Sequence, residues 1–265
     1  MNFPRIMGVV NVTPDSFSDG GQFISPAQAI DHALRLIDQG ADQLDIGGES
    51  TRPGAEGIVP VDEEMHRVIP VIEGIRRIHA GIPISIDTRK AIVAEAALES
   101  GATMVNDVTA GRHDPAMFAI VTRHDVPFVV MHMQGTPGTM QDSPMYADVV
   151  AEVHEFLRER VEAARNAGIG TVYVDVGIGF GKTLEHNLSL LRNLQRFNDL
   201  GDGQVLGISR KRFLGAITGI TEPRERDEAT ALMHALLAAV PVYMIRVHNV
   251  ELIGRLRLLV RSLNG

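Results

Sequence analysis

Short apolar runs recur along this chain, and each is followed by a polar residue and then by a stretch of helical character. The runs are rich in β-branched residues and lie at 6–10, 43–46, 82–86, 103–105, 126–131, 171–174, 205–208 and 242–245. Continuous rather than alternating apolarity is typical of strands covered on both faces, as in parallel sheets. The pattern therefore predicts eight buried parallel strands.

The segments between these runs have the periodicity of amphipathic helices. It is clearest over 145–167, where the apolar residues form one stripe and Glu and Arg lie outside it. Gly40, Gly81, Gly101 and Gly168 each stand just before a predicted strand, and we expect each to end a helix in the left-handed conformation. Strand, loop, helix and glycine thus form a repeating βα unit.

Eight such units, without a linker or a shift in composition, favour one closed barrel over an open doubly wound sheet, which usually has about five or six strands. The 265 residues of the chain slightly exceed the roughly 250 that are typical of a (β/α)8 barrel. We therefore predict an α/β protein, a TIM barrel with a single domain spanning residues 1–265.

Composition and charge narrow the possible functions. The formal net charge of −8 argues against a nucleic-acid-binding protein, because phosphate contacts require a basic surface. The chain has no cysteine, which excludes disulfides, thiolate metal sites and cysteine nucleophiles. Neither a signal peptide nor an apolar span of about 18 residues is recognisable, so we expect a cytoplasmic protein without a membrane partner.

The polar residues that close the predicted strands should meet at one end of the barrel, where such folds carry their sites. They are Asn11, Asp45, Asp87, Asn106, His132, Asp175, Ser209 and Arg246. Asp87, Asn106 and Asp175, together with Lys211, suit a flat heterocycle with donors and acceptors on its edge, because a carboxylate accepts two parallel N–H bonds. The alternative, that these residues merely cap the rim, is weaker for the set than for any single member.

Two basic segments follow the last two strands. They are Ser209-Arg210-Lys211-Arg212 and Arg246-Val247-His248-Asn249, and the loops in these places bind phosphate in many barrels. Arg210 and Arg212 are equally compatible with a solvated surface. Arg246 is not, because it ends an apolar strand.

The glycine-rich segment 177–183 imitates nucleotide-binding loops without matching them. A P-loop needs glycine where Val176 stands, and the dinucleotide fingerprint needs glycine where Lys182 stands. We interpret the segment as a tight loop that lets a flat ligand approach the backbone near Asp175. The histidines show no metal-binding spacing; His248 fits a diphosphate contact, and His132 fits a rim position.

Two predicted loops are long for a barrel. They span 11–24 and 47–60, and both leave from the end of the barrel that carries the polar residues. Loops of this length are commonly lids or binding loops.

With these residues in place, the chain resembles the dihydropteroate synthase family over nearly its whole length and in the family's order. The matching segments are 11–21, 47–54, 87–88, 106–107, 131–135, 179–182, 209–211 and 246–248. The family often has Asp-Pro-Gly-Phe-Gly-Phe-Gly where this chain reads Asp175-Val176-Gly177-Ile178-Gly179-Phe180-Gly181, so a proline and one aromatic residue are replaced.

The resemblance implies a transferase of folate biosynthesis. It would join 6-hydroxymethyl-7,8-dihydropterin diphosphate to 4-aminobenzoate, giving 7,8-dihydropteroate and diphosphate. It implies Mg²⁺ as the cofactor, a homodimer, small-molecule substrates, no nucleic-acid partner, and inhibition by sulfonamides.

The resemblance also assigns roles by position. Asp87, Asn106, Asp175 and Lys211 match the residues that hold the pterin, with Arg246 packing near the ring. The diphosphate side is matched by Arg246, Val247 and His248, and by Asn11, which also helps to hold Mg²⁺. The arylamine site and the two loops are matched by Phe17, Thr51, Arg52, Pro53, Ser209 and Lys211.

We expect mainly electrostatic catalysis by Asp87, Lys211, Arg246 and His248, because the pterin can carry positive charge as diphosphate leaves. Asp45 and His132 receive no role, and a structural one is favoured for both. Three alternatives stay open: a pterin-dependent methyltransferase, which has no diphosphate to bind; a related protein that binds pterin or a partner without turnover; and a barrel for another phosphorylated metabolite.

Overall fold

The predicted barrel is present in the computed structural model, which describes residues 3–13, 25–50 and 59–264. Its eight strands are all parallel and are β1 (Arg5–Asn11), β2 (Gln43–Gly47), β3 (Ile84–Asp87), β4 (Met104–Asp107), β5 (Phe128–Met131), β6 (Val172–Asp175), β7 (Val205–Leu206) and β8 (Met244–Val247). They pair in the order β6-β5-β4-β3-β2-β1-β8-β7. A single parallel bridge between Val174 and Gln204 joins the β6 and β7 sides, so the ring is nearly closed.

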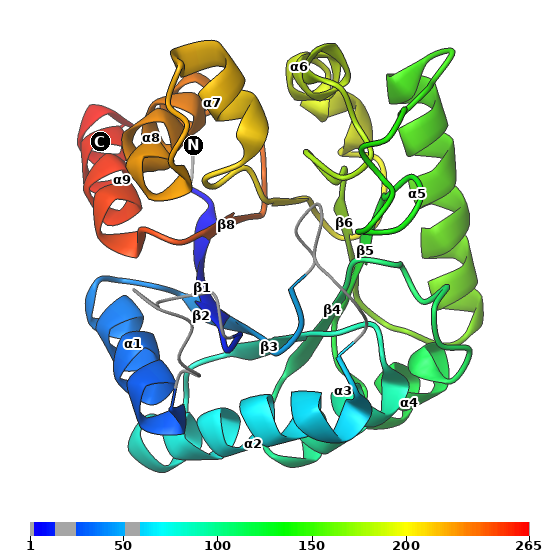
Figure 1. Cartoon of the computed structure of the whole chain (residues 1–265), viewed down its shortest axis with the longest axis vertical. Coiled ribbons are helices and arrows are strands. Elements are labelled where there is room, and N and C mark those ends of the chain that lie inside the picture. The colour runs from blue at the N-terminus through cyan, green and yellow to red at the C-terminus, as the bar shows by residue number, and fades with distance from the viewer. Residues whose placement is uncertain (1–2, 14–24, 51–58, 265) are drawn as a thin grey trace.

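The helices surround this ring, as Figure 1 shows in a view into the barrel. They are α1 (Pro26–Asp38), α2 (Val61–Ile78), α3 (Ala91–Glu99), α4 (Met117–His124), α5 (Val149–Asn166), α6 (Leu184–Arg192), α7 (Arg212–Thr218), α8 (Asp227–Leu236) and α9 (Val250–Asn264), with short 3₁₀ helices η1 (Leu194–Phe197) and η2 (Pro223–Arg226). In the described part of the chain, no helix is both long and apolar enough to cross a membrane.

Local sequence signals explain where several helices begin. Ser25 and Thr183 each form a capping box, in which the side chain of the cap and that of the third helical residue satisfy each other's backbone N–H groups. Asp148 accepts hydrogen bonds from the amides of Val150 and Ala151. The stripe predicted over 145–167 is therefore shorter than expected, because α5 begins only after this cap.

Three of the four expected glycine caps are confirmed. Gly40, Gly101 and Gly168 have φ angles of 99°, 110° and 95° and directly follow the last helical turn. The prediction for Gly81 was wrong. Helix α2 ends at Ile78, and Nδ1 of its capping residue His79 accepts a hydrogen bond from the amide of Ile82 at 3.1 Å. The turn therefore needs no left-handed glycine at this position.

The side chains inside the barrel form a separate apolar cluster from those between barrel and helices. Its members come from six strands and are Met7, Met104, Val129, Tyr173, Val205 and Met244. They belong mostly to the first half of each strand, so the amino-terminal half of the interior is mainly apolar. Polar groups are left to the carboxyl-terminal half, where the site is built.

Candidate active site

Three polar strand ends lie together at the carboxyl end of the barrel, as the sequence predicted. Asp87, Asn106 and Asp175 are 8%, 7% and 6% exposed and are the last or nearly the last residues of β3, β4 and β6. Asp87 and Asn106 are in register on neighbouring strands. Carboxylates and an amide so deeply buried need polar partners, and these come from the opposite strands.

The first partner is Arg246 of β8. Its Nε donates to Asp45 Oδ2 at 2.6 Å and its Nη2 donates to Asp87 Oδ2 at 2.9 Å. Asn106 Nδ2 donates to the same Asp45 oxygen at 3.3 Å. One guanidinium thus joins two carboxylates from β2 and β3, and the amide of β4 completes the group.

Asp45, for which the sequence favoured a structural role, takes part in this group. It is fully buried, and it accepts hydrogen bonds from both Arg246 and Asn106, so it contacts two of the predicted site residues. The predicted strand already contained Asp45. Its neighbours Leu44 and Ile46 pack in the core between barrel and helices, so the alternation of side chains along β2 directs Asp45 into the barrel. A carboxylate within an otherwise apolar strand is the signal that could have found it, since such a charge is buried only when it is paired.

The charges of this group shift one another's protonation. Burial, and then the neighbouring Asp45, raise the pKa of Asp87 from 3.8 to about 7, although Arg246 opposes the shift. Burial lowers the pKa of Arg246, but Asp45 and Asp87 outweigh it, and the net pKa lies above its usual value. Arg246 stays a cation, while Asp87 can exchange a proton near neutral pH.

Lys211 and Asp175 form the opposite wall. Burial lowers the pKa of Lys211 to about 8, although Asp175 opposes the shift. Burial also raises the pKa of Asp175, against the effect of Lys211. The ammonium donates to the carbonyl oxygen of Ile178 and lies 4.5 Å from the centre of the Phe180 ring. The cation is therefore held at the pocket edge by a carbonyl and an aromatic face.

Gly207, directly after β7, lies beside both of these side chains. A Cβ atom at this position would lie 3.6 Å from Asp175 Oδ2 and 3.9 Å from Lys211 Nζ. A side chain at this position would therefore contact both the carboxylate and the ammonium. Gly207 was not among the predicted site residues, because nothing in the sequence pattern marks it.

The glycine loop after β6 is held firmly without a proline. Gly177, Gly179 and Gly181 all have positive φ angles, and a Cβ at Gly177 would lie 1.8 Å from the carbonyl oxygen of His132. The amide of Gly177 donates to Asp175 Oδ1 at 2.7 Å, which orients that carboxylate. The close packing of the loop on the segment after β5 restricts the backbone here, as the proline that the family often has at position 176 would do.

Buried polar contacts of Lys182 and His132 also hold this loop. Lys182 Nζ lies 2.8 Å from His132 Nδ1 and donates to the carbonyl of Phe180 at 3.0 Å. Burial, followed by the charge of Lys182, lowers the pKa of His132 to about 2, so the ring is neutral and accepts the bond. The structural role expected for His132 agrees with this contact, but the sequence did not reveal its lysine partner.

Ser209 and His248 connect the loops after β7 and β8. The amide of His248 donates to Ser209 Oγ at 3.2 Å, and His248 Nδ1 lies 3.0 Å from the same oxygen. Val247 is different, because its side chain is fully buried in the core between barrel and helices. Asn11, at the end of β1, is half-buried and in register with Gly47.

A buried charge cluster supports the start of the loop after β2. Lys90 Nζ lies 2.6 Å from Glu49 Oε2 and also binds Glu64, while Arg89 reaches Glu49 at 2.5 Å. Thr88, beside Asp87, donates to Glu64 at 2.7 Å. The predicted loop residues Phe17, Thr51, Arg52 and Pro53 lie outside the described residues.

Comparison with known proteins agrees with this geometry. The family model described as pterin binding enzyme matches residues 7–248. The chain is 42% identical to a dihydropteroate synthase of a Synechocystis species over 95% of this chain and 87% of that protein.

Two solved structures of the Xanthomonas albilineans dihydropteroate synthase are similar to it over 99% of this chain and 94% of theirs. The one with 4-aminobenzoic acid has a TM-score of 0.92 at 46% identity, and the one in complex with 7,8-dihydropteroate has 0.88 at 43%. The extent of the family match, together with the buried polar strand ends Asp87, Asn106 and Asp175, shows that the chain belongs to the family of pterin-binding enzymes.

Proposed function

We infer that this protein is a dihydropteroate synthase, which condenses 6-hydroxymethyl-7,8-dihydropterin diphosphate with 4-aminobenzoate. The observation that carries this conclusion is that two pairs of buried polar side chains lie at the same end of the barrel. Asp87 and Asn106 form one pair, and Asp175 and Lys211 form the other. A pterin has amine and ring N–H donors beside a carbonyl acceptor, so it needs carboxylates and a cation in one plane. The relatives named above carry the same activity in their names.

Asp175 and Lys211 would hold the edge of the ring that carries the amide-like group. Asp175 Oδ1 already accepts the amide of Gly177 at 2.7 Å, which leaves Oδ2 toward the opening in front of Gly207. Asp87 and Asn106 would meet the other edge. Arg246 lies beside Asp87 and can cover the ring while it faces the diphosphate.

Arg246 and His248 would bind the diphosphate, since both leave β8 at this end of the barrel. Asn11 is a suitable ligand for Mg²⁺, because this hard cation takes oxygen ligands and is usually held by one or two protein groups together with substrate phosphates. No group of three or more His, Cys, Asp or Glu side chains suited to a metal ion occurs among the described residues. When bound, Mg²⁺ would neutralise charge on the diphosphate.

The bond between the methylene carbon and the diphosphate oxygen breaks, and its electron pair leaves with the diphosphate. The nitrogen lone pair of the arylamine forms the new C–N bond, and the nitrogen then loses one proton to solvent. Ionised Asp87 and Asp175 favour the positive charge that the pterin carries in between, while Arg246 and His248 stabilise the leaving anion. Ser209 and Lys211, with Phe17, Thr51, Arg52 and Pro53, would position the arylamine.

Two further proposals follow from the family. Exposed leucines lie on the adjacent helices α8 and α9, with Leu232 and Leu236 60% and 79% exposed and Leu259 and Leu263 66% and 87% exposed. We propose that this face forms a homodimer, because apolar patches of this kind mark interfaces. Replacing Leu232 and Leu236 by Glu should then give a monomer by light scattering. The cytoplasmic location stays a prediction.

The activity is tested with purified protein, the pterin diphosphate, 4-aminobenzoate and Mg²⁺. We expect dihydropteroate by chromatography, diphosphate release that depends on the arylamine, and inhibition by a sulfonamide that added 4-aminobenzoate relieves. Tight pterin binding without condensation, or methyl transfer from methyltetrahydrofolate, would contradict the proposal. The matched control for substitutions of the carboxylates Asp45 and Asp87 is Asp42→Asn. Asp42 lies just before the amino end of β2, away from the proposed site, so this variant should keep full activity.

A further inference from the structure

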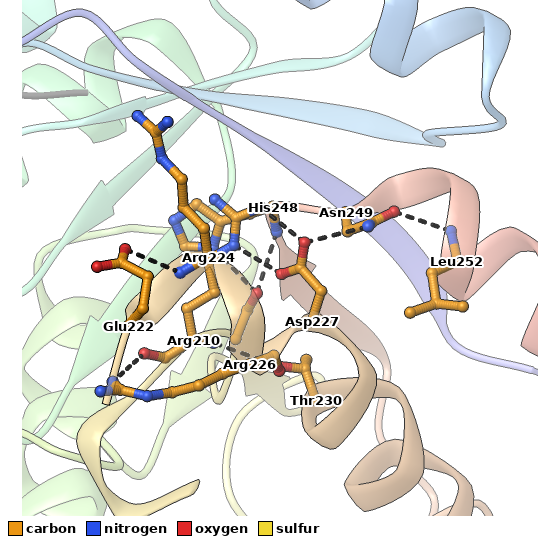
Figure 2. Close-up of polar contacts among 10 residues, drawn as sticks. Arg210, Glu222, Arg224, Arg226, Asp227, Thr230, His248, Asn249 and Leu252 are labelled. Atoms are coloured by element: carbon orange, nitrogen blue, oxygen red, sulfur yellow. Dashed lines mark hydrogen bonds and ion pairs between the residues drawn. The ribbon is translucent and has the colours of Figure 1, made fainter. Parts of the chain in front are cut away.

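A polar cluster lies outside the pocket, beneath the loops that follow β7 and β8. Figure 2 shows Asp227, the first residue of α8, between Arg210 on one side and Asn249 on the other. Asp227 accepts from Arg210 Nε at 2.6 Å and Nη2 at 2.8 Å, and from Asn249 Nδ2 at 3.1 Å. One carboxylate therefore contacts both loops, and its place at a helix N-terminus favours its charge.

The first contact holds Arg210 in an unusual backbone conformation. Arg210 has a φ angle of 62°, which side-chain-bearing residues seldom adopt. Its amide donates to Thr230 Oγ1 at 3.2 Å, and its carbonyl accepts from Arg226 Nη1 at 3.0 Å. Arg210 is thus fixed by backbone and side chain to η2 and α8, and it is not the solvated residue that the sequence allowed. Its neighbours Ser209 and Lys211 contact His248 and the carbonyl of Ile178.

The second contact holds the loop after β8. Asn249 Oδ1 accepts the amide of Leu252 at 3.0 Å and so caps the start of α9, while its Nδ2 is directed to Asp227. His248 precedes it and contacts Ser209 on the pocket side. The two loops are therefore joined twice, once inside the pocket and once behind it.

We propose that Asp227 is a positioning residue that places Lys211 and His248 together, and so aligns the pterin half of the site with the diphosphate half. The proposal rests on the proposed function, which assigns those halves. The bidentate pair with Arg210 sets the direction in which Lys211 leaves the turn. The bond to Asn249 sets the position of His248. Precise support of this kind keeps the reacting methylene carbon aligned between the residues that hold the pterin and those that hold the diphosphate.

The two contacts can be separated by binding measurements. The probes are 6-hydroxymethylpterin for the pterin half and pyrophosphate with Mg²⁺ for the other, each titrated alone into the full-length protein. We expect Asp227→Asn to raise both Kd values about tenfold, as removal of supporting residues commonly does. Arg210→Gln should raise mainly the Kd for the pterin, and Asn249→Ala mainly that for pyrophosphate. In the Arg210→Gln background, Asp227→Asn should weaken only pyrophosphate binding further.

Glu228→Gln is the matched control. Glu228 is the other acidic residue in the first turn of α8, and it is exposed, so the variant removes the same charge from the helix end without touching either loop. Its two Kd values should stay within about twofold of the unsubstituted protein. If Glu228→Gln weakens both probes as Asp227→Asn does, the helix charge is responsible and the inference is overturned.

Other outcomes are equally decisive. Unchanged Kd values in Asp227→Asn, or a change in one probe only, would overturn the joint positioning role while the proposed function stands. If Asp227→Asn does not fold, the Arg210→Gln and Asn249→Ala variants decide, because each should weaken a different probe. An unsubstituted protein that binds neither probe would remove the proposed function and this inference with it.

Discussion

The two ends of the barrel interior are built from different side chains, although both lie within one ring of strands. At the amino end, Met7, Met104 and Val129 pack with their neighbours, and the rings of Tyr173 and Tyr243 stack at 4.6 Å. At the carboxyl end, the corresponding layer holds the carboxylates and the guanidinium of Asp45, Asp87 and Arg246. One end contributes stability by burying apolar surface, and the other contains charges whose burial opposes it.

The difference shows where function is located in this fold. Burial raises the pKa of Asp87 to about 7, so its ionised form is unfavourable in the folded protein even beside Arg246. A protein selected for stability alone would not retain such a group. The charged end is therefore expected to control activity, and the apolar end to control stability.

Among the variants that test this difference between the charged and the apolar end, Asp87→Asn should have the largest effect on activity. It removes a carboxylate that would accept from the pterin and favour its positive charge, and a charged hydrogen bond is worth about 1.5–3 kcal/mol. With two such bonds we expect kcat/KM to fall about 100-fold or more. Initial rates of dihydropteroate formation, at varied concentrations of both substrates, measure this loss.

The stability of the same variant should change in a way that depends on pH. The folded pKa of Asp87 is raised above its usual 3.8, so between about 4 and 7 the folded protein binds more protons than the unfolded chain. Stability from this group is therefore lost as the pH rises through that window. The drop in Tm between pH 5 and pH 8 should be smaller in Asp87→Asn. A large fall in Tm at pH 8 with little loss of activity would contradict the division.

Asp87, Asn106 and Asp175 could be predicted from the sequence because the ends of parallel strands meet at one rim, whatever the details of packing. The partners of Asp45 and of Lys182 could not be predicted. Asp45 is bound by Arg246, 201 residues later in the chain, and only the closure of the barrel brings the two together. The partner of Lys182 is His132, fifty residues earlier, and only the packing of one loop on another brings them together.

The pH dependence of kcat/KM should be bell-shaped, because the two walls of the pocket titrate in opposite senses. Activity should rise through about pH 7 as Asp87 ionises and fall through about pH 8 as Lys211 loses its proton. Away from the optimum the rate should change about tenfold per pH unit. The optimum is expected between these values.

Variants show whether the acidic and basic limbs of this pH profile come from the protein or from titration of the substrate. Asp87→Asn should abolish the acid limb and Lys211→Gln the basic limb. Because the diphosphate itself titrates, binding of 6-hydroxymethylpterin is followed over the same range. An acid limb that persists in Asp87→Asn would assign it to another group.

A smaller effect is expected from Asp45→Asn. The amide oxygen can still accept from Arg246 Nε, but the charge that balances the guanidinium is lost. We expect kcat/KM to fall about tenfold, which is within the range for a weakened charged hydrogen bond. Asp45 touches Arg246 and Asn106, so the KM for the pterin diphosphate should rise more than kcat falls. An unchanged KM would return Asp45 to the structural role that the sequence favoured.

The smallest effect on activity is expected from Met104→Ala at the apolar end. Met104 is buried in the strand cluster, and truncating such a side chain costs about 2–5 kcal/mol. The Tm should fall by roughly 5–15 °C, while kcat/KM stays within about twofold at a temperature where the variant is folded. Met104→Leu is the control, because it keeps the volume and loses only the sulfur that Gln43 Nε2 contacts at 3.5 Å. Should Met104→Ala lose activity tenfold while folded, packing at the amino end must influence the charges at the other end, and the two halves of the interior would act as one unit.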